Sequence, residues 1–159
     1  MLAPASRLAT ANTVTIERSS PLLVTDSPPV GSALATTTKN AKNTTWTTPL
    51  AELDVRPGGA NLIVMRNPEG EEFPNQGVYL EVVRNERLVF TDAYVRAWEP
   101  AQQPFMTVIL TFDDLGGKTR YTARVLHWTA AAREQHEQMG FHQGWGQCAD
   151  QLAELLKRM

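Results

Sequence analysis

The stretch AAAREQHEQMGFHQGWGQCADQLAELLKRM (residues 130–159) carries the strongest fold signal in the chain. Apolar residues recur there at steps of three and four, the spacing that places side chains on one face of a helix. They are Phe141, Trp145, Cys148, Leu152, Leu155 or Leu156, and Met159. The opposite face is charged, with acids early and bases in the last turn, as the helix dipole favours. The pattern predicts one long amphipathic helix that buries its apolar face against another layer.

Three glycines interrupt this predicted helix, at Gly140, Gly144 and Gly146. Each costs roughly 1 kcal/mol relative to alanine in a helix interior, so a structural reason for them is expected. The missing side chains either let the helix backbone pack closely against its neighbour or leave a hollow between them. The sequence leaves both explanations open.

Upstream of the helix, alternating apolar and polar residues predict an antiparallel sheet. The expected strands cover residues 13–18, 50–55, 60–66, 76–83, 88–96, 105–112 and 118–126, and turn-forming residues such as those at 67–70 separate them. A sheet with one apolar face must bury that face, and only the C-terminal helix is left to cover it. The expected fold class is therefore α+β, with the sheet wrapped around the helix.

Composition limits the class of protein. At 159 residues the chain is long enough for one domain with a core, and a net charge of −2 with a pI near 5.9 argues against nucleic-acid binding. A single cysteine excludes an internal disulfide and is expected to be a small buried apolar side chain. The sequence contains no run of eighteen apolar residues, so no membrane span is predicted. The first fifteen residues lack the apolar core of a secretory signal, and a cytoplasmic location is therefore expected.

Residues 20–49 differ from the rest because they are rich in Ser, Thr and Pro and show neither helical nor strand periodicity. Such a segment is expected to be irregular or disordered. The predicted organisation is thus a flexible N-terminus at 1–12 and a single domain at 13–159, with 20–49 as its atypical part.

Two groups of sequence motifs resemble a known family. AELDVRPGG at 51–59, GVYLEVV at 77–83 and ERLVFT at 86–91 form the first group, and AREQH at 132–136, GW at 144–145 and DQL at 150–152 form the second. Together they resemble the family named after the heat shock protein 90 ATPase activator, in the START-like (SRPBCC) superfamily, over roughly residues 49–159. The resemblance implies a helix-grip fold with a hydrophobic cavity between sheet and helix. Family members usually carry two short helices after the first strand, and the composition of 20–49 does not predict them.

The resemblance implies a site for a small apolar or aromatic ligand. We expect no cofactor and no metal. The expected ligand-binding residues lie on the inner strand faces and on the helix: Met65, Tyr79, Phe90, Asp92, Tyr94, Met106, Val108, Tyr121, Phe141, Gly144, Trp145 and Cys148. An HExxH zinc motif would begin at His136, but position 140 is glycine, so the motif fails.

Asp92 is the one candidate for catalysis. By strand alternation it shares a face with Phe90 and Tyr94, which would place a carboxylate among apolar side chains, where it could act as an acid or base. The alternatives are that a bulge breaks the alternation at this point, or that Asp92 pairs with an arginine such as Arg96 or Arg124. The fold, the family resemblance and Asp92 together suggest three candidate functions. The first is a non-enzymatic binding protein, the second is a domain that contacts a chaperone, as the family name implies, and the third is a cyclase or hydratase that uses Asp92.

Overall fold

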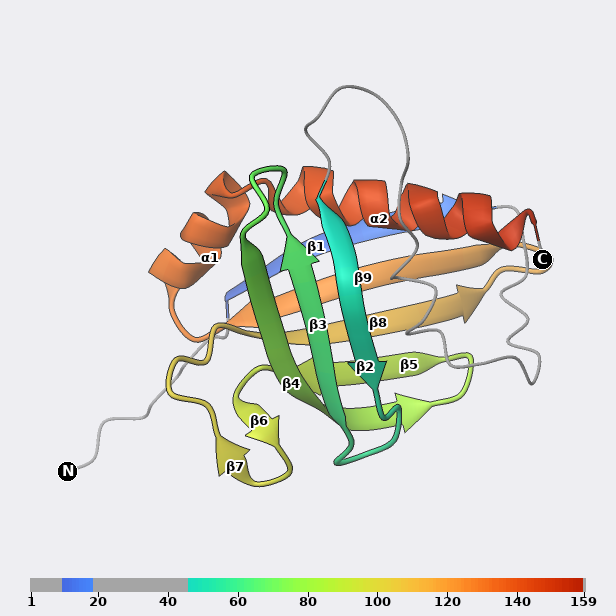
Figure 1. The fold of residues 1–159 in the computed structure, drawn as a ribbon. Coiled ribbons are helices and arrows are strands. Elements are labelled where there is room, and N and C mark those ends of the chain that lie inside the picture. Colours follow the sequence, from blue (N-terminus) through green and yellow to red (C-terminus); the bar gives the residue numbers. More distant parts are fainter. Residues whose placement is uncertain (1–9, 19–45, 159) are drawn as a thin grey trace.

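The computed structural model describes residues 10–18 and 46–158, which form an antiparallel sheet and two helices (Figure 1). The sheet strands are β1 (Thr10–Arg18), β2 (Thr47–Leu53), β3 (Ala60–Arg66), β4 (Glu72–Val83), β5 (Arg87–Thr91), β8 (Met106–Asp114) and β9 (Thr119–His127). A separate hairpin consists of β6 (Tyr94–Arg96) and β7 (Glu99–Pro100), and the helices are α1 (Ala130–Gln138) and α2 (Phe141–Leu156). The predicted α+β helix-grip fold is confirmed.

Strand order in the sheet is β1-β9-β8-β5-β4-β3-β2. The strands from β2 to β9 follow one another as a meander, as predicted, apart from the β6–β7 hairpin. The first strand instead pairs with the last one, and its register places Thr10 opposite His127. The chain therefore enters the sheet at one edge and resumes at the opposite edge.

The C-terminal segment forms two helices, so the prediction of one long helix was wrong. Gly140 has a φ of +92°, which only glycine adopts without strain, and the helical pattern stops there. The amide of Gly140 donates to the carbonyl of Glu137 at 3.0 Å, which closes α1, and the chain then turns into α2. Thr129 caps the start of α1, as expected, because its hydroxyl accepts from the amide of Ala132 at 3.1 Å.

A second difference lies in the predicted strand at 88–96, which is split into β5 and β6. The break falls at Asp92 and Ala93, where the backbone leaves the ladder. The Asp92 carboxylate accepts from the amides of Phe105 (2.9 and 3.0 Å to its two oxygens) and Met106 (3.0 Å), so it joins the end of β5 to the start of β8. Because the Asp92 side chain satisfies these backbone amides, they do not need a carbonyl from a neighbouring strand, and the ladder can end here.

The core lies between α2 and the strands β8 and β9, toward the β1 edge of the sheet. Its buried residues are Val108, Leu110, Ala123, Val125 and Phe141. Alternation in β8 and β9 places these strand residues on the inner face, as the sequence predicted. The β2 end of the sheet lies far from this core, and the turn between β2 and β3 is at the end of the molecule away from α2 (Figure 1).

The predicted atypical segment 20–49 lies outside the described residues up to position 45. Its last residues enter β2, which begins at Thr47. Of the expected flexible N-terminus, only residues 10–12 are described, and they belong to β1. Asn12 is buried there, and its amide donates to the carbonyl of Arg133 at 3.3 Å, which ties β1 to α1.

Candidate functional site

The inner face of the sheet brings together half of the predicted ligand-binding residues. Val108 and Phe141 are buried in the core, and four larger side chains pack partly exposed around it: Phe90, Met106, Tyr121 and Trp145. Ring centroids are 6.1 Å apart for Phe141 and Trp145, and 5.6 Å apart for Tyr121 and Phe112. These residues form the inner cluster, which lies between β5, β8 and β9 on one side and α2 on the other.

The other predicted residues lie at its edges or beyond it. Tyr79 is buried in β4, and the centroid of its ring lies 6.1 Å from that of Phe90. Met65 is 38% exposed at the end of β3. Tyr94 belongs to the β6–β7 hairpin, where its ring lies 6.2 Å from that of Trp98.

Gly144 in α2 lies beside open space, because a methyl group added at its Cα would meet no atom within 4 Å, and the same holds for Gly146. Helical geometry places these residues on either flank of the buried stripe that contains Phe141 and Trp145. Tight backbone packing, one of the two explanations for the glycines, is therefore not observed at these positions. Gly144 is exposed, so the open space beside it is continuous with solvent, and a hollow between sheet and helix stays a prediction.

Asp92 is half-buried, and its carboxylate is occupied by the three hydrogen bonds to the amides of Phe105 and Met106. Neither arginine expected as its partner takes this role, since Arg96 pairs with Glu99 in the hairpin. A carboxylate whose two oxygens both accept backbone hydrogen bonds is held in one orientation. Asp92 thus has a structural role in the turn between β5 and β8.

Two polar groups border the inner cluster, the Tyr121 hydroxyl from β9 and the Cys148 thiol from α2. Burial raises the pKa of Tyr121 well above its usual range, and the nearby Cys148 adds to this shift. Cys148 as a residue is exposed, contrary to expectation, while partial desolvation of its sulfur raises the pKa of the thiol. A thiol with a raised pKa is a poor nucleophile.

Sequence reasoning missed a pair of histidines at the end of the inner cluster. Nε2 of His127, at the end of β9, lies 2.9 Å from Nδ1 of His136 in α1. The ring of Phe105 packs against both imidazoles at 5.4 and 5.1 Å, and Phe141 packs against His136 at 5.0 Å. Burial lowers the pKa of His136, and the neighbouring His127 lowers it further. No sequence pattern predicts the pair, because the two histidines are nine positions apart and belong to different elements, a strand and a helix.

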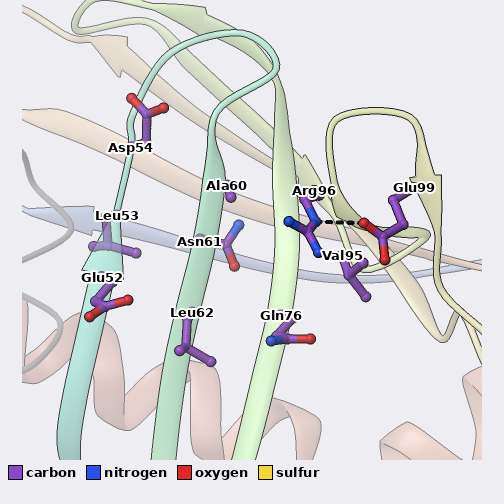
Figure 2. Close-up of a pocket in the computed structure, with 10 residues that line it drawn as sticks. All are labelled: Glu52, Leu53, Asp54, Ala60, Asn61, Leu62, Gln76, Val95, Arg96 and Glu99. Carbon is purple, nitrogen blue, oxygen red and sulfur yellow. Dashed lines mark hydrogen bonds and ion pairs between the residues drawn. The ribbon is translucent and has the colours of Figure 1, made fainter.

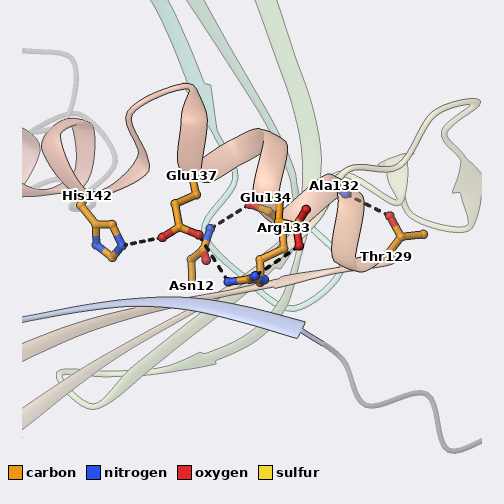
Figure 3. A network of polar contacts seen from close by, with 7 residues as sticks. All are labelled: Asn12, Thr129, Ala132, Arg133, Glu134, Glu137 and His142. Atoms are coloured by element: carbon orange, nitrogen blue, oxygen red, sulfur yellow. Dashed lines mark hydrogen bonds and ion pairs between the residues drawn. The ribbon is translucent and has the colours of Figure 1, made fainter.

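A polar network holds α1 beside β1 (Figure 3). Arg133 pairs with Glu137 at 3.3 Å and lies 3.7 Å from Glu134, while its carbonyl accepts from Asn12. The imidazole of His142 lies 3.9 Å from the same Glu137. These contacts fix the orientation of α1 over the histidine pair.

A groove of about 770 Å³ lies at the other end of the sheet, beside the β6–β7 hairpin (Figure 2). Its lining comes from β2, β3 and β4 and from the hairpin: Glu52, Leu53, Asp54, Ala60, Asn61, Leu62, Gln76, Val95, Arg96 and Glu99. None of the predicted ligand-binding residues lines it. Of its three carboxylates, Asp54 pairs with Arg56 and Glu99 pairs with Arg96.

Among residues 10–18 and 46–158, no three metal-ligating side chains come together. In this part of the chain no helix is long and apolar enough to cross a bilayer.

The sequence profile of the family described as "Activator of Hsp90 ATPase homolog 1-like protein" matches residues 34–157. The chain belongs to this family. The match begins upstream of the roughly 49–159 expected from sequence motifs, so the Hsp90-activator-like similarity extends into the segment that showed no periodicity. No curated protein matches the chain.

Solved structures agree with this family. An X-ray structure of a protein from Nitrosomonas europaea is 36% identical, with a TM-score of 0.76, over 93% of this chain and 94% of that one. A Mycobacterium smegmatis protein (22% identity, TM-score 0.67, 93% and 91% covered) and one from Staphylococcus epidermidis (20%, 0.63, 93% and 90%) share the fold. The helix-grip architecture of this Hsp90-activator-like chain is therefore shared with bacterial proteins over nearly its whole length.

Proposed function

We propose that this chain is a binding protein that holds a small apolar or aromatic molecule between the inner face of its sheet and α2. The observation that carries the proposal is the incomplete burial of the inner cluster. Phe90, Met106, Tyr121 and Trp145 stay partly exposed around a small closed core, in which Val108 and Val125 are the largest fully buried side chains. Large apolar side chains that converge without burying one another are typical of ligand-binding walls.

The open flanks of α2 support the same site. Gly144 and Gly146 border the stripe that packs on the sheet, and a methyl group added at either Cα would have no neighbour within 4 Å. Glycine lowers the stability of a helix, and at these two positions it leaves the flanks of the buried stripe uncovered. That space adjoins Trp145, which is itself half-buried.

Titration with a neutral, environment-sensitive naphthalene probe tests the proposal. The wild-type chain is expected to bind the probe with a blue shift in its emission, since the site excludes water. Gly144→Leu should reduce the affinity at least about tenfold, because a leucine side chain occupies the space beside Trp145. Gln147→Leu is the matched control, since residue 147 is exposed and points away from the sheet. Equal affinity in all three proteins, or no binding by the wild type, would refute the site.

The family name supplies a second candidate, an interaction with a chaperone ATPase. One surface feature favours a protein contact: Trp98 at the tip of the β6–β7 hairpin is 87% exposed and has a φ of +63°, which is strained for a bulky residue. Exposed tryptophan is enriched in protein interfaces. If this contact exists, the wild-type chain should change the ATPase rate of purified Hsp90, and Trp98→Ala should remove the change while the melting temperature stays the same.

A further inference from the structure

The two edge strands of the sheet differ in how their free edges are covered. The strands β1 and β2 end the sheet on opposite sides. Both helices pack against β1, whereas the main contacts of β2 are with β3. Pro49, which has no amide hydrogen, and a register shift between Thr47 and Leu50 interrupt regular pairing along the first part of β2. Residues 50–53 have neither of these protective features.

The hydrogen-bond register shows which backbone groups of β2 face outward. The amide of Asp54 donates to the carbonyl of Ala60 at 3.0 Å, and Glu52 belongs to the same unbroken register. In an antiparallel pair, hydrogen-bonded positions alternate with non-hydrogen-bonded ones. The backbone groups of Glu52 and Asp54 are therefore directed at β3, and those of Ala51 and Leu53 are directed away from it. None of these outward N–H and C=O groups has a hydrogen-bond partner in the described part of the chain.

The side chain between the two outward positions is a carboxylate. Glu52 is exposed on the outer face of the sheet, and it has no ion-pair partner among the residues that the structure describes. It forms a row with Leu62 of β3 and Gln76 of β4 in the lining of the groove (Figure 2). Asp54 and Glu99 add two more carboxylates to this lining, against a single guanidinium. The free edge of β2 therefore borders a groove with an excess of negative charge.

We propose that the free edge of β2 binds an extended segment of a partner protein that places a lysine or arginine opposite Glu52. The added strand exchanges backbone hydrogen bonds with Ala51 and Leu53, as in other sheets that bind peptides at an edge. In an antiparallel arrangement, Glu52 falls at a non-hydrogen-bonded pair, where facing side chains are closest and opposite charges attract. The apolar stem of the basic residue then lies toward Leu62 in the groove. This surface is separate from the apolar site beside α2 and does not depend on it.

The charge of Glu52 favours such a partner over a second copy of the chain. The sequence of β2 contains no lysine or arginine, so two copies of β2 paired with each other gain no ion pair at Glu52. A pairing centred on this residue would bring two carboxylates together, which is unfavourable.

Amide hydrogen exchange of the full chain, followed by NMR, tests the edge. In the free protein the amides of Ala51 and Leu53 should exchange at least about tenfold faster than that of Glu52, which is bonded to β3. The blocked pentapeptide Thr-Val-Lys-Val-Thr should then slow exchange at Ala51 and Leu53 and leave Glu52 unchanged. This alternating pattern is specific for an added strand.

A charge swap tests the basic residue. The peptide Thr-Val-Glu-Val-Thr should bind the wild type about three- to tenfold more weakly than the lysine peptide in an NMR titration. Glu52→Lys should reverse that order. Glu69→Lys is the matched control, because it changes the charge equally in the turn between β3 and β4 and should preserve the wild-type order. Ala51→Pro, which removes one outward amide hydrogen and no ladder bond, should weaken both peptides.

Three results overturn the proposal. Slow exchange at Ala51 and Leu53 in the dilute free protein would show that the edge is already covered. Protection that rises with protein concentration alone would assign the edge to a second copy of the chain. Equal binding of the two peptides, or binding of neither, would exclude the basic partner. Glu52→Lys changes an exposed side chain, so the charge swap remains decisive even where Ala51→Pro disturbs the strand.

Discussion

The two ends of the sheet are built differently. Around β8 and β9, the inner residues Val108, Ala123 and Val125 are completely buried under α2. Around β2, β3 and the start of β4, larger apolar residues stay exposed, with Met65 at 38% and Phe73 at 43%. Of the described helix–strand contacts, those of α1 and α2 go to β1 and β9, and none of comparable extent reaches β2 or β3.

This difference teaches that one half of the sheet carries the stability and the other half is available for contacts. Burial of apolar area is the main source of folding free energy, so the half under α2, here called the closed half, should dominate unfolding. The half formed by β2, β3 and the start of β4, called the open half, buries less apolar area and should contribute less to the free energy of unfolding.

Phe141→Ala should lower the free energy of unfolding by about 3–5 kcal/mol, because it removes the buried aromatic ring that joins α2 to β8 and β9. Phe73→Ala, in the open half, should cost less than about 1 kcal/mol, since its side chain is already 43% exposed. Urea unfolding followed by circular dichroism measures both. Similar losses in the two variants would remove the distinction between the halves.

Gly140→Ala should destabilise the chain by about 1–2 kcal/mol, because alanine at a φ of +92° brings its Cβ too close to the backbone. The substitution tests whether the break between α1 and α2 is required, since alanine would favour the single long helix that the sequence pattern predicts. Thermal melts measure the loss. A gain in stability would show that the helices can fuse without losing the contacts of the closed half.

Acidification should weaken the attachment of α1 to the closed half. Burial and the neighbouring His127 lower the pKa of His136 in the folded chain, so the unfolded chain takes up a proton first as pH falls. The stabilisation is therefore complete above about pH 6.5 and is lost as pH falls through the folded-state pKa. The charged groups on the same helix as His136 include Arg133 and Glu137, which pair with each other at 3.3 Å.

Unfolding by urea between pH 7.5 and 5 measures this dependence. His136→Gln removes the titrating group while it keeps a side chain of similar polarity, so its stability should vary less with pH over that range. An equal slope in the two proteins would assign the pH dependence to other groups.

Gly144→Ala should raise stability by up to about 1 kcal/mol, the smallest of these effects, because alanine favours the helix and its methyl group meets no neighbour. Calorimetric melting measures the gain. A loss instead would mean that the flank of α2 is packed, which would also count against a ligand beside Trp145.

Local patterns predicted much of this architecture. Strand alternation in β8 and β9 identified the inner residues, and turn residues marked most strand ends within a few positions. The patterns failed where a single contact between distant segments decides the backbone. Asp92 interrupts a continuous strand pattern because amides at Phe105 and Met106 need its carboxylate, and periodicity contains no information about that need.

The candidate site was predictable in part for the same reason. Strand alternation identifies Phe90, Met106 and Tyr121 as inner-face residues, and helical spacing places Phe141 and Trp145 on one face of α2. These five residues could therefore be grouped from the sequence. Exposure could not be read this way, and Cys148 was expected to be buried although it is exposed. The histidine pair also escaped, because its two members belong to different elements and only the turn of the chain at Thr129 brings them together.

The pairing of β1 with β9 has a consequence for how the chain is made. Residues 10–18 are synthesised before every other strand of the sheet, yet their ladder partner at 119–127 is the last strand of the sheet to be made. Until β9 has been made, the sheet is incomplete beside β1. The two helices, which follow β9 in the chain, therefore lack the paired β1 surface on which they pack. Contacts so distant in sequence slow folding. The closed half, which holds the molecule together, is therefore the part that a growing chain completes last.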